Sequence, residues 1–480
     1  MTSPPTLVWL RRDLRVADNP ALAAAAQDGP VLPVFILDPA DRWAPGGAAR
    51  WWLHHSLARL ENAIAARGGR LAFGLGPPAA ELPRLALATG ARRVLWNRGL
   101  DPRAPEQEAA VAAALAAHSI DSAGFPADLL AQPGTVRSRS GGSFQVFTAF
   151  WRAWRALPPP PTPLPAPARL AAPAEPPSGP TLADLDLLPR PRWWDGLAEI
   201  WQPGEDAAAQ RLVAFLDAGV AAYATRRDQP GEDGTSRLSP HLAFGEIGPR
   251  QIWHAATTRE PSQGAETFLR EVGWRDFSHA LLADHPDLPD RPLRPEFAAF
   301  PWDPPPGALA AWQRGETGFP IVDAGMRQLW RTGWMHNRVR MIVASFLVKD
   351  LLTPWQTGEA WFWDTLVDAS PAVNAASWQW VAGCGADAAP YFRVFNPVLQ
   401  GEKFDPRGRY VRRWLPELAG LPDRWVHRPW EAEPLALAAA GIALDRTYPR
   451  PILDHGAARQ RALAAFAGLR VARGGSAPPA

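Results

Sequence analysis

Short apolar runs near the start of the chain are continuous rather than alternating in hydrophobicity, which is typical of strands buried on both faces of a sheet. These runs occupy residues 7–10, 31–37, 71–75 and 94–97. Ala-rich stretches of helical length alternate with them, at residues 19–27, 48–67, 79–89 and 105–118. Because strands and helices alternate at this spacing, the pattern predicts a doubly wound parallel α/β sheet, a Rossmann-like domain that we expect over residues 1–132.

The turn after the first predicted strand lacks the Gly-rich fingerprint G-x-G-x-x-G of dinucleotide-binding folds. The string Arg11-Arg12-Asp13-Leu14-Arg15 stands there instead. A dinucleotide is therefore not expected to bind this domain in the usual way.

Helical periodicity replaces the alternation in the second part of the chain. Residues 158–180 are packed with Pro and Ala and carry almost no hydrophobic pattern, which is typical of an extended, semi-rigid linker. Beyond about residue 201, apolar positions recur with helical spacing, interrupted by Gly and Pro. We therefore expect an interdomain linker over residues 133–200 and an all-α domain over residues 201–475.

Composition indicates a soluble globular protein and excludes several kinds of site. The 480 residues are 47% hydrophobic and 20% charged, and no apolar run approaches the ~18 residues of a membrane span. The N-terminal sequence does not resemble a secretion signal, so we expect a cytoplasmic protein. The single cysteine, Cys384, excludes a disulfide framework, a Cys-rich zinc site and a four-cysteine iron–sulfur cluster, and we predict no metal.

Net charge and tryptophan content bear on the partner and the chemistry. A net charge of +2 at pH 7 is compatible with a nucleic-acid partner, but any phosphate-binding stripe must be local. Tryptophan is in excess, with 24 Trp against 4 Tyr, and the block from Gly318 to Asn396 is rich in it. Most of these side chains are expected to pack in cores or interfaces.

Hydroxyl residues precede one predicted helix of the second part. In the string Gly-Thr-Ser-Arg-Leu-Ser-Pro from Gly234, Ser239 fits an N-cap and Pro240 the first helical position. Hydroxyls and free backbone N–H groups at such an end favour an anion. A plain capped helix explains the same string, so phosphate binding depends on the neighbouring residues.

A second group of residues has the spacing of one broad helical face. Its members are Phe268, Glu271, Trp274, Arg275 and Ser278. A flat aromatic ring beside a carboxylate suits a planar heterocycle, which stacks on the ring while its N–H groups donate to the carboxylate. An amphipathic helix with a surface ion pair is the alternative.

A third group follows Gly333, which we expect to end one helix just before another begins. Asn337, Arg340 and Met341 would share one face of the new helix, where Asn offers a base both a donor and an acceptor. His336 is assigned no role.

A fourth group, from Asp368 to Trp380, places Trp378 and Trp380 on either side of Gln379 after a Pro-broken loop. Core packing alone does not require such a string.

Across these strings the chain resembles the photolyase/cryptochrome family, and within it the class I cyclobutane pyrimidine dimer DNA photolyases. The resemblance extends from Leu7 to about Phe466. Its long matches are Val-Trp-Leu-Arg-Arg-Asp-Leu-Arg from Val8, Thr-Gly-Phe-Pro-Ile-Val-Asp-Ala-Gly-Met-Arg from Thr317, Gly-Trp-Met-His-Asn-Arg from Gly333 and Ala-Ser-Phe-Leu-Val-Lys-Asp from Ala344. It implies an α/β antenna domain joined by a long linker to a helical, FAD-binding catalytic domain.

The resemblance implies a set of flavin contacts. These are Tyr223, Thr235, Ser236, Arg237, Leu238, Ser239, Phe268, Arg275, Asn337, Arg340, Asp368, Ser370 and Asn374. Arg340 and Asp368 resemble the ion pair set against the flavin ring, and Asn374 resembles the residue that faces flavin N5. A neutral amide there accepts from N5–H and so tunes the cofactor.

The resemblance also implies a DNA-lesion site and an electron-transfer chain. The lesion and DNA contacts are Arg227, Glu271, Trp274, Asn337, Arg338, Met341, Trp380 and Arg393. The chain of tryptophans is Trp302, Trp355 and Trp378. The implied activity is that of a deoxyribodipyrimidine photo-lyase, in which photoexcited reduced FAD passes an electron to a pyrimidine dimer flipped out of DNA. We expect a monomer with DNA as its partner.

Two positions depart from the class I pattern: Ser370 stands where many relatives have Asp, and Ala375 where many have Asn. The folate-binding motif is absent after the fourth strand, and Trp96 to Pro102 only loosely resembles deazaflavin binders. A second, antenna chromophore, deazaflavin-like or folate, therefore stays open.

Three rival functions share parts of this pattern. A cryptochrome photoreceptor without repair activity is disfavoured by the complete lesion set, by Asn374 in place of an Asp, and by the short stretch after the helical domain. A photolyase for (6-4) photoproducts would use a His pair where this chain has Met335 and His336. A light-insensitive electron-transfer flavoprotein leaves the tryptophan chain and the basic rim of the lesion site unexplained.

Overall fold

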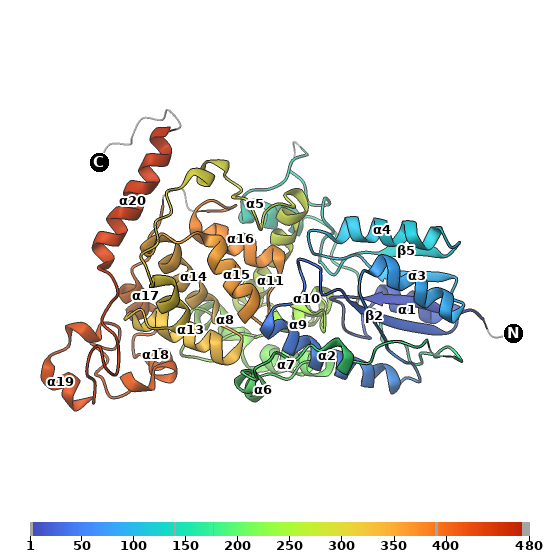
Figure 1. The fold of residues 1–480 in the computed structure, drawn as a ribbon, viewed down its shortest axis with the longest axis horizontal. Coiled ribbons are helices and arrows are strands. Elements are labelled where there is room, and N and C mark those ends of the chain that lie inside the picture. The colour runs from blue at the N-terminus through green and yellow to red at the C-terminus, as the bar shows by residue number, and fades with distance from the viewer. Residues whose placement is uncertain (1–2, 139–140, 176, 389–391, 473–480) are drawn as a thin grey trace. The chain divides into compact units, whose positions relative to one another are not determined.

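Figure 1 shows the computed structural model, which describes residues 3–138, 141–175, 177–388 and 392–472, with backbone alone for 470–472. The chain forms two compact units. The first comprises Met1–Ala221, Ser236–Pro286 and Val367–Val373, and the second Ala222–Thr235, Asp287–Leu366 and Asn374–Ala480. The domain boundaries expected from the sequence, 1–132, 133–200 and 201–475, stay a prediction.

The first unit contains a parallel five-stranded sheet in the order β3-β2-β1-β4-β5. Its strands are β1 (Thr6–Leu10), β2 (Val31–Leu37), β3 (Ala72–Leu75), β4 (Arg93–Asn97) and β5 (Asp121–Phe125). The connecting helices are α1 (Pro20–Asp28), α2 (Gly47–Ala65), α3 (Pro78–Thr89) and α4 (Ala104–Ala116). The predicted doubly wound sheet is therefore confirmed. The pattern misses β5, because this edge strand reads Asp-Ser-Ala-Gly-Phe and has no apolar run.

Alternate residues of the central strands direct one face of the sheet toward α3 and α4. Leu7 and Trp9 of β1 are buried in one cluster with Val94 and Trp96 of β4, together with residues of both helices. Helices α3 and α4 also pack side by side, as Figure 1 shows. Because the crossovers of parallel sheets are right-handed and the strand order reverses at β1, the connections through α1 and α2 belong to the opposite face.

The first unit has further helices outside the sheet. They are α5 (Phe147–Arg155), η1 (Ala183–Leu185), α6 (Asp195–Ile200), α7 (Glu205–Ala218), α9 (Ser239–Ala243), α10 (Pro249–Thr257) and α11 (Gln263–Asp284). The described residues of 158–180 form neither helix nor strand, as their Pro-rich composition predicts. Leu164 N donates to Asp18 Oδ1 at 3.0 Å, so this segment is attached to the turn after β1.

The named elements of the second unit are all helical in the described part of the chain, apart from one isolated bridge between Leu444 and Tyr448. They are α8 (Tyr223–Arg226), η3 (Pro295–Ala299), α12 (Ala308–Arg314), α13 (Pro320–Thr332), α14 (Asn337–Ser345), the π-helix η4 (Phe346–Asp350), α15 (Trp355–Thr365), α16 (Pro371–Ala382, in this unit from Asn374), α17 (Pro397–Phe404), α18 (Arg409–Trp414), η5 (Pro416–Leu418), η6 (Pro429–Glu431), α19 (Pro434–Ala439) and α20 (His455–Ala472). The predicted all-α part is confirmed. Of the helices whose residues the structure describes, none is both long and apolar enough to cross a membrane.

Candidate functional site

Helix α11 presents the predicted aromatic and acidic residues of the first unit. Ser262 caps it by accepting from Ala265 N at 3.1 Å, and the helix then continues for 22 residues. Phe268 is buried with its ring centroid 4.8 Å from that of Phe215, whereas Glu271 and Trp274 are partly exposed. The helix therefore offers a carboxylate and an indole one turn apart to a ligand.

Arg275 of the same helix is directed into the protein. Its Nη1 donates to the backbone oxygen of Asp128 at 2.8 Å, and burial lowers the pKa of Arg275. Burial also raises the pKa of the neighbouring Asp276 to about 7, although Arg275 lies beside it. This part of α11 is an anchor to the loop at Asp128, and the flavin contact expected of Arg275 stays a prediction.

The hydroxyl-rich segment before α9 is only partly as expected. The prediction that Ser239 is the N-cap and Pro240 the first helical residue is wrong: α9 begins at Ser239, and Leu238 occupies the cap position without a side-chain cap bond. Leu238 already has helical backbone angles (φ −85°, ψ −5°), so the turn closes one residue earlier. Arg237 has φ +51°, a backbone conformation rare outside Gly and enriched at functional sites.

Thr235 ends a segment of the second unit, and Ser236 to Ser239 belong to the first. Leu238 N donates to Ser236 Oγ at 3.4 Å, which folds the segment locally. Asp368 and Ser370 lie partly exposed in the loop before α16. Arg340 lies in the other unit, so its expected pairing with Asp368 stays a prediction.

Helix α14 carries four predicted residues of the second unit. Gly333, with φ +64°, ends α13 as expected, and His336, to which the sequence assigns no role, caps α14 by accepting from Arg338 N at 3.2 Å. Asn337 at its start is exposed, and Met341 one turn later is partly exposed. The helix thus places an amide and a thioether on one side.

The two arginines of α14 already have protein partners. Arg338 forms an ion pair with Asp228 at 2.9 Å and lies 4.4 Å from the ring centroid of Phe404. Arg340 Nε donates to the backbone oxygen of Met335 at 2.8 Å. Both guanidinium groups are therefore held in place by other groups of the protein.

Helix α16 separates its two tryptophans by environment. Trp378 is 2% exposed, whereas Trp380 is partly exposed and donates from Nε1 to the backbone oxygen of Asp387 at 3.0 Å. Gln379 between them is fully buried and bonds to the backbone of Leu288, Arg291 and Leu293. The Gln therefore fixes the rotation of the helix, and the two indoles point to different surroundings.

Asn374, one turn before Trp378, is buried, and its Nδ2 donates to the backbone oxygen of Glu359 at 3.0 Å. Because the nitrogen end of this amide is bound to the protein, its oxygen is the end left to face a ligand. A fixed acceptor is what a flavin N5–H requires, so this residue fits FAD. The other flavin contacts expected from the sequence stay a prediction.

The predicted electron-transfer residues lie on α15, on α16 and before α12. A Cβ on Gly358 would lie 2.2 Å from Trp378 Cη2, so α15 packs directly on that indole one turn after Trp355. Trp302 is partly exposed and lies 4.4 Å from the ring centroid of Phe300. Trp312, used in the sequence analysis only as a spacing reference, is fully buried with its ring centroid 6.4 Å from that of Trp378.

Two predicted residues lie near the start of the second unit. Tyr223 is buried at the first position of α8, and the guanidinium carbon of Arg227 is 5.6 Å from its ring centroid. Arg227 is partly exposed, so it can reach a phosphate without losing this contact.

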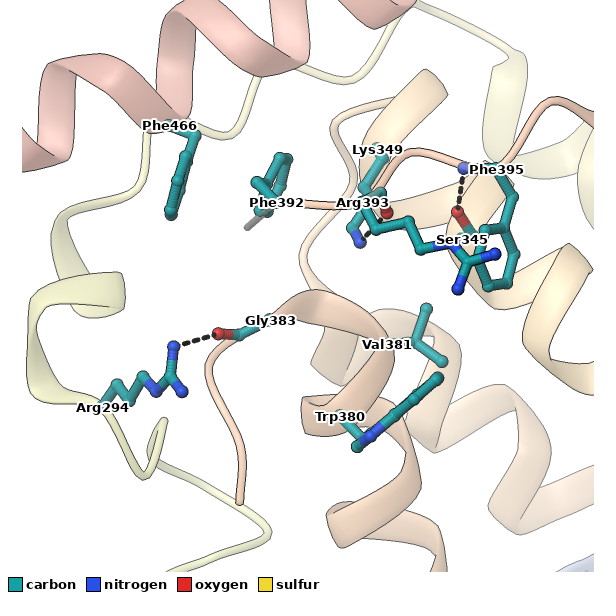
Figure 2. Close-up of a pocket in the computed structure, with 10 residues that line it drawn as sticks. All are labelled: Arg294, Ser345, Lys349, Trp380, Val381, Gly383, Phe392, Arg393, Phe395 and Phe466. Carbon is teal, nitrogen blue, oxygen red and sulfur yellow. Dashed lines mark hydrogen bonds between the residues drawn. The ribbon is translucent and has the colours of Figure 1, made fainter. Parts of the chain in front are cut away.

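Figure 2 shows a pocket of the second unit that contains two predicted DNA contacts, Trp380 and Arg393. The side chain of Arg393 is exposed, and its backbone oxygen accepts from Nζ of Lys349. Lys349 is 4% exposed and lies 4.6 Å from the ring centroid of Phe392, and burial lowers its pKa to about 7. Lys349 is not among the site residues predicted from the sequence, because no local pattern distinguishes a buried lysine from an exposed one.

Comparisons with known proteins define the class. A family model described as DNA photolyase matches residues 6–168, and one described as the FAD binding domain of DNA photolyase matches residues 268–468. The chain is 48% identical to a deoxyribodipyrimidine photo-lyase of Agrobacterium fabrum, over 97% of this chain and 98% of the relative. It is 38% identical to Cryptochrome-1 of Arabidopsis thaliana, over 95% of this chain and 69% of the relative. The chain belongs to the DNA photolyase family and has its FAD-binding domain.

Solved structures agree on the fold and correct the subclass. A bacterial class III photolyase from Agrobacterium tumefaciens has a TM-score of 0.95 and 47% identity, with 98% of each chain covered. An archaeal photolyase from Sulfolobus tokodaii that contains two FAD molecules has a TM-score of 0.81 and 28% identity, covering 97% of this chain and all of the other. The class I assignment is thus not supported, and the comparison points to class III.

Proposed function

We propose that this photolyase is of class III and repairs cyclobutane pyrimidine dimers in DNA under blue light. The observation that carries the proposal is helix α16, which carries a buried amide (Asn374), a buried indole one turn later (Trp378) and, two residues further on, a partly exposed indole (Trp380). The first suits a flavin, the second suits electron supply, and the third suits a base removed from its stack.

The lesion contacts follow from the chemistry of a pyrimidine pair. Glu271 accepts from the base N–H groups and Asn337 supplies both donor and acceptor. Trp274 and Trp380 each stack on a pyrimidine, which is worth about 1–3 kcal/mol per base. Arg227, Arg338 and Arg393 contact phosphates, so binding weakens as salt rises.

When bound, reduced FAD would supply, on absorbing blue light, the electron that splits the dimer and would regain it after cleavage. The protein residues hold and tune this cofactor. Asn374 would offer its oxygen to flavin N5–H, and Arg340 and Asp368 are the charged residues that we assign to the flavin ring. The indoles of Trp378, Trp355 and Trp302 would provide a path along which electrons from an external reductant reach a photoexcited, oxidised flavin.

Cryptochrome-type signalling without repair is the second candidate, favoured by the 38% identity to Cryptochrome-1 of Arabidopsis thaliana. The two functions share the flavin and the tryptophans, so those residues do not separate them. The lesion residues do, because a photoreceptor has no need of Glu271 beside the partly exposed indole of Trp274.

The decisive experiment is repair of a thymine-dimer oligonucleotide by the purified, flavin-reduced protein under blue light, with a dark control. We expect thymines to be restored only in the light. Absence of light-dependent restoration, with FAD bound and DNA present, would refute the repair function and favour signalling. Extraction of the released pigments in the same preparation identifies any second chromophore, and a sizing column tests the expected monomer.

A further inference from the structure

Phe147 of helix α5 stacks on one face of the Trp274 indole. The ring centroids of Phe147 and Trp274 are 3.9 Å apart, and their planes differ by 13°. Phe147 is 1% exposed, whereas Trp274 is partly exposed. One face of the indole is therefore covered by a buried phenyl ring, in a stacked geometry that aromatic pairs favour.

Phe147 is itself held from two sides. Its ring centroid is 5.9 Å from that of Phe277 on α11, and the two ring planes differ by 65°. On α5 it lies 6.1 Å from Trp151, nearly parallel at 18°. Because both contacts are with buried rings, Phe147 has little freedom to tilt.

The same helix also contacts α11 beside the indole. A Cβ on Gly273 would lie 2.4 Å from Cζ3 of Trp151, so only Gly permits this approach. Trp151 in turn stacks on Trp154, with centroids 4.9 Å apart and planes 3° apart. Helix α5 thus fixes the backbone of α11 next to Trp274 as well as its side chain.

We propose that Phe147 is a positioning residue for dimer recognition. By covering one face of Trp274 it sets the plane of the indole, so that a pyrimidine of the dimer stacks on the remaining face without first ordering the side chain. Pre-ordering of this kind strengthens binding, because the rotamer entropy is already lost in the free protein. The inference rests on the proposed lesion contact of Trp274 and adds a residue that does not touch the lesion.

The test compares two buried phenylalanines of α5. Phe147→Leu removes the stack, and Phe150→Leu is the matched control: Phe150 is 2% exposed and contacts Phe277 at 5.2 Å. Dissociation constants of the holoenzyme are measured for a thymine-dimer oligonucleotide and for the undamaged one, with Tm and FAD content. We expect Phe147→Leu to weaken dimer binding roughly twofold to tenfold and to leave undamaged DNA unchanged. Phe150→Leu should lower Tm with dimer binding unchanged.

A double-mutant cycle separates positioning from general destabilisation. In a Trp274→Ala background, Phe147→Leu should cause no further loss of dimer affinity. In the otherwise native chain, Phe147→Tyr keeps a stacking ring and should retain the native affinity for the dimer. Equal losses from Phe147→Leu and Phe150→Leu, or an undiminished loss in the Trp274→Ala background, would overturn the inference. If the native enzyme neither binds nor repairs the dimer, the proposed function fails instead.

Discussion

Trp274 in the first unit and Trp380 in the second are both partly exposed indoles, and different interactions hold them. Trp274 is stacked on Phe147, so the interaction is with the face of the ring. Trp380 donates its N–H to the backbone oxygen of Asp387, so the interaction is with the edge. Stacking fixes the plane of an indole but uses one face, whereas an edge hydrogen bond fixes its rotation and by itself leaves the faces uncovered.

The interactions that hold Trp274 and Trp380 also depend on different kinds of local structure. The stack on Trp274 comes from a regular helix whose aromatic residues recur at helical spacing. The bond to Trp380 ends at Asp387, a residue with φ +53° outside any helix. A regular element positions one indole and an irregular loop the other, so the second depends on the local backbone.

The largest effect is expected from a third indole, Trp378, which shares α16 with Trp380. Trp378→Phe should block photoreduction of the oxidised flavin, because phenylalanine is much harder to oxidise than tryptophan. Repair by chemically reduced enzyme should be spared. Flavin absorbance under blue light measures photoreduction, and restoration of thymines measures repair by the chemically reduced enzyme. Trp380→Phe is the control that should photoreduce normally; an unchanged photoreduction rate in Trp378→Phe would remove this residue from the chain.

Removal of either partly exposed indole should weaken dimer binding strongly. Trp274→Ala and Trp380→Ala each lose a stacked base, at about 1–3 kcal/mol, which corresponds to roughly 5- to 150-fold in the dissociation constant. Titration with dimer-containing and undamaged oligonucleotides measures the difference. Unchanged dimer affinity in both variants, with FAD retained, would contradict the stacking role.

Two buried groups, one in each unit, should make the stability of the protein depend on pH in opposite directions. Burial raises the pKa of Asp276 in α11 to about 7, so the folded state binds the extra proton and its stability falls as pH rises from about 4 to 7. Burial lowers the pKa of Lys349 in η4 to about 7, so the unfolded state binds the extra proton and stability rises as pH goes from about 7 to 10.

The limiting slope of either effect is about 1.4 kcal/mol per pH unit. Asp276→Asn should therefore flatten the dependence of Tm on the acid side, and Lys349→Met the dependence on the alkaline side. Thermal unfolding of the three proteins at pH 5, 7 and 9 measures both. Identical pH profiles for the native and substituted proteins would show that these groups titrate normally.

The smallest effect is expected when each indole is replaced by phenylalanine. These two variants compare the stacked Trp274 with the hydrogen-bonded Trp380 directly. Phe retains a stacking ring but has no N–H, so Trp380→Phe should cost the hydrogen bond to Asp387, about 0.5–1.5 kcal/mol. Trp274→Phe keeps the stack on Phe147 and should weaken dimer binding less than Trp380→Phe does. Dimer dissociation constants of the two variants provide the measurement, and a larger loss in Trp274→Phe would reverse the comparison.

Much of the fold follows from local patterns, because buried strands and helices repeat their apolar residues at fixed spacings. The exceptions have local causes. β5 is an edge strand with a polar sequence, and the cap of α9 is displaced because Leu238 takes a helical conformation before Ser239. Neither feature can be read from hydrophobicity alone.

The candidate site likewise has features that local sequence predicts and features that depend on residues far apart in the chain. Residues that share a helix, such as Glu271 and Trp274, can be placed together from their spacing. The stack of Phe147 on Trp274 joins residues far apart in the sequence, although the aromatic spacing of 147, 151 and 154 is itself a helical signal. The burial of Lys349 depends on the segment that carries Phe392, and no local signal reveals it.

The N–H group of Trp378 is buried and has no hydrogen-bond partner among the residues that the structure describes. An indole that loses an electron becomes far more acidic at its N–H, and it normally releases that proton to a nearby acceptor. Without an acceptor in contact, an oxidised Trp378 would keep its proton and remain a radical cation. If Trp378 belongs to the proposed electron-transfer chain, the positive charge would then move on to another indole instead of being trapped as a neutral radical.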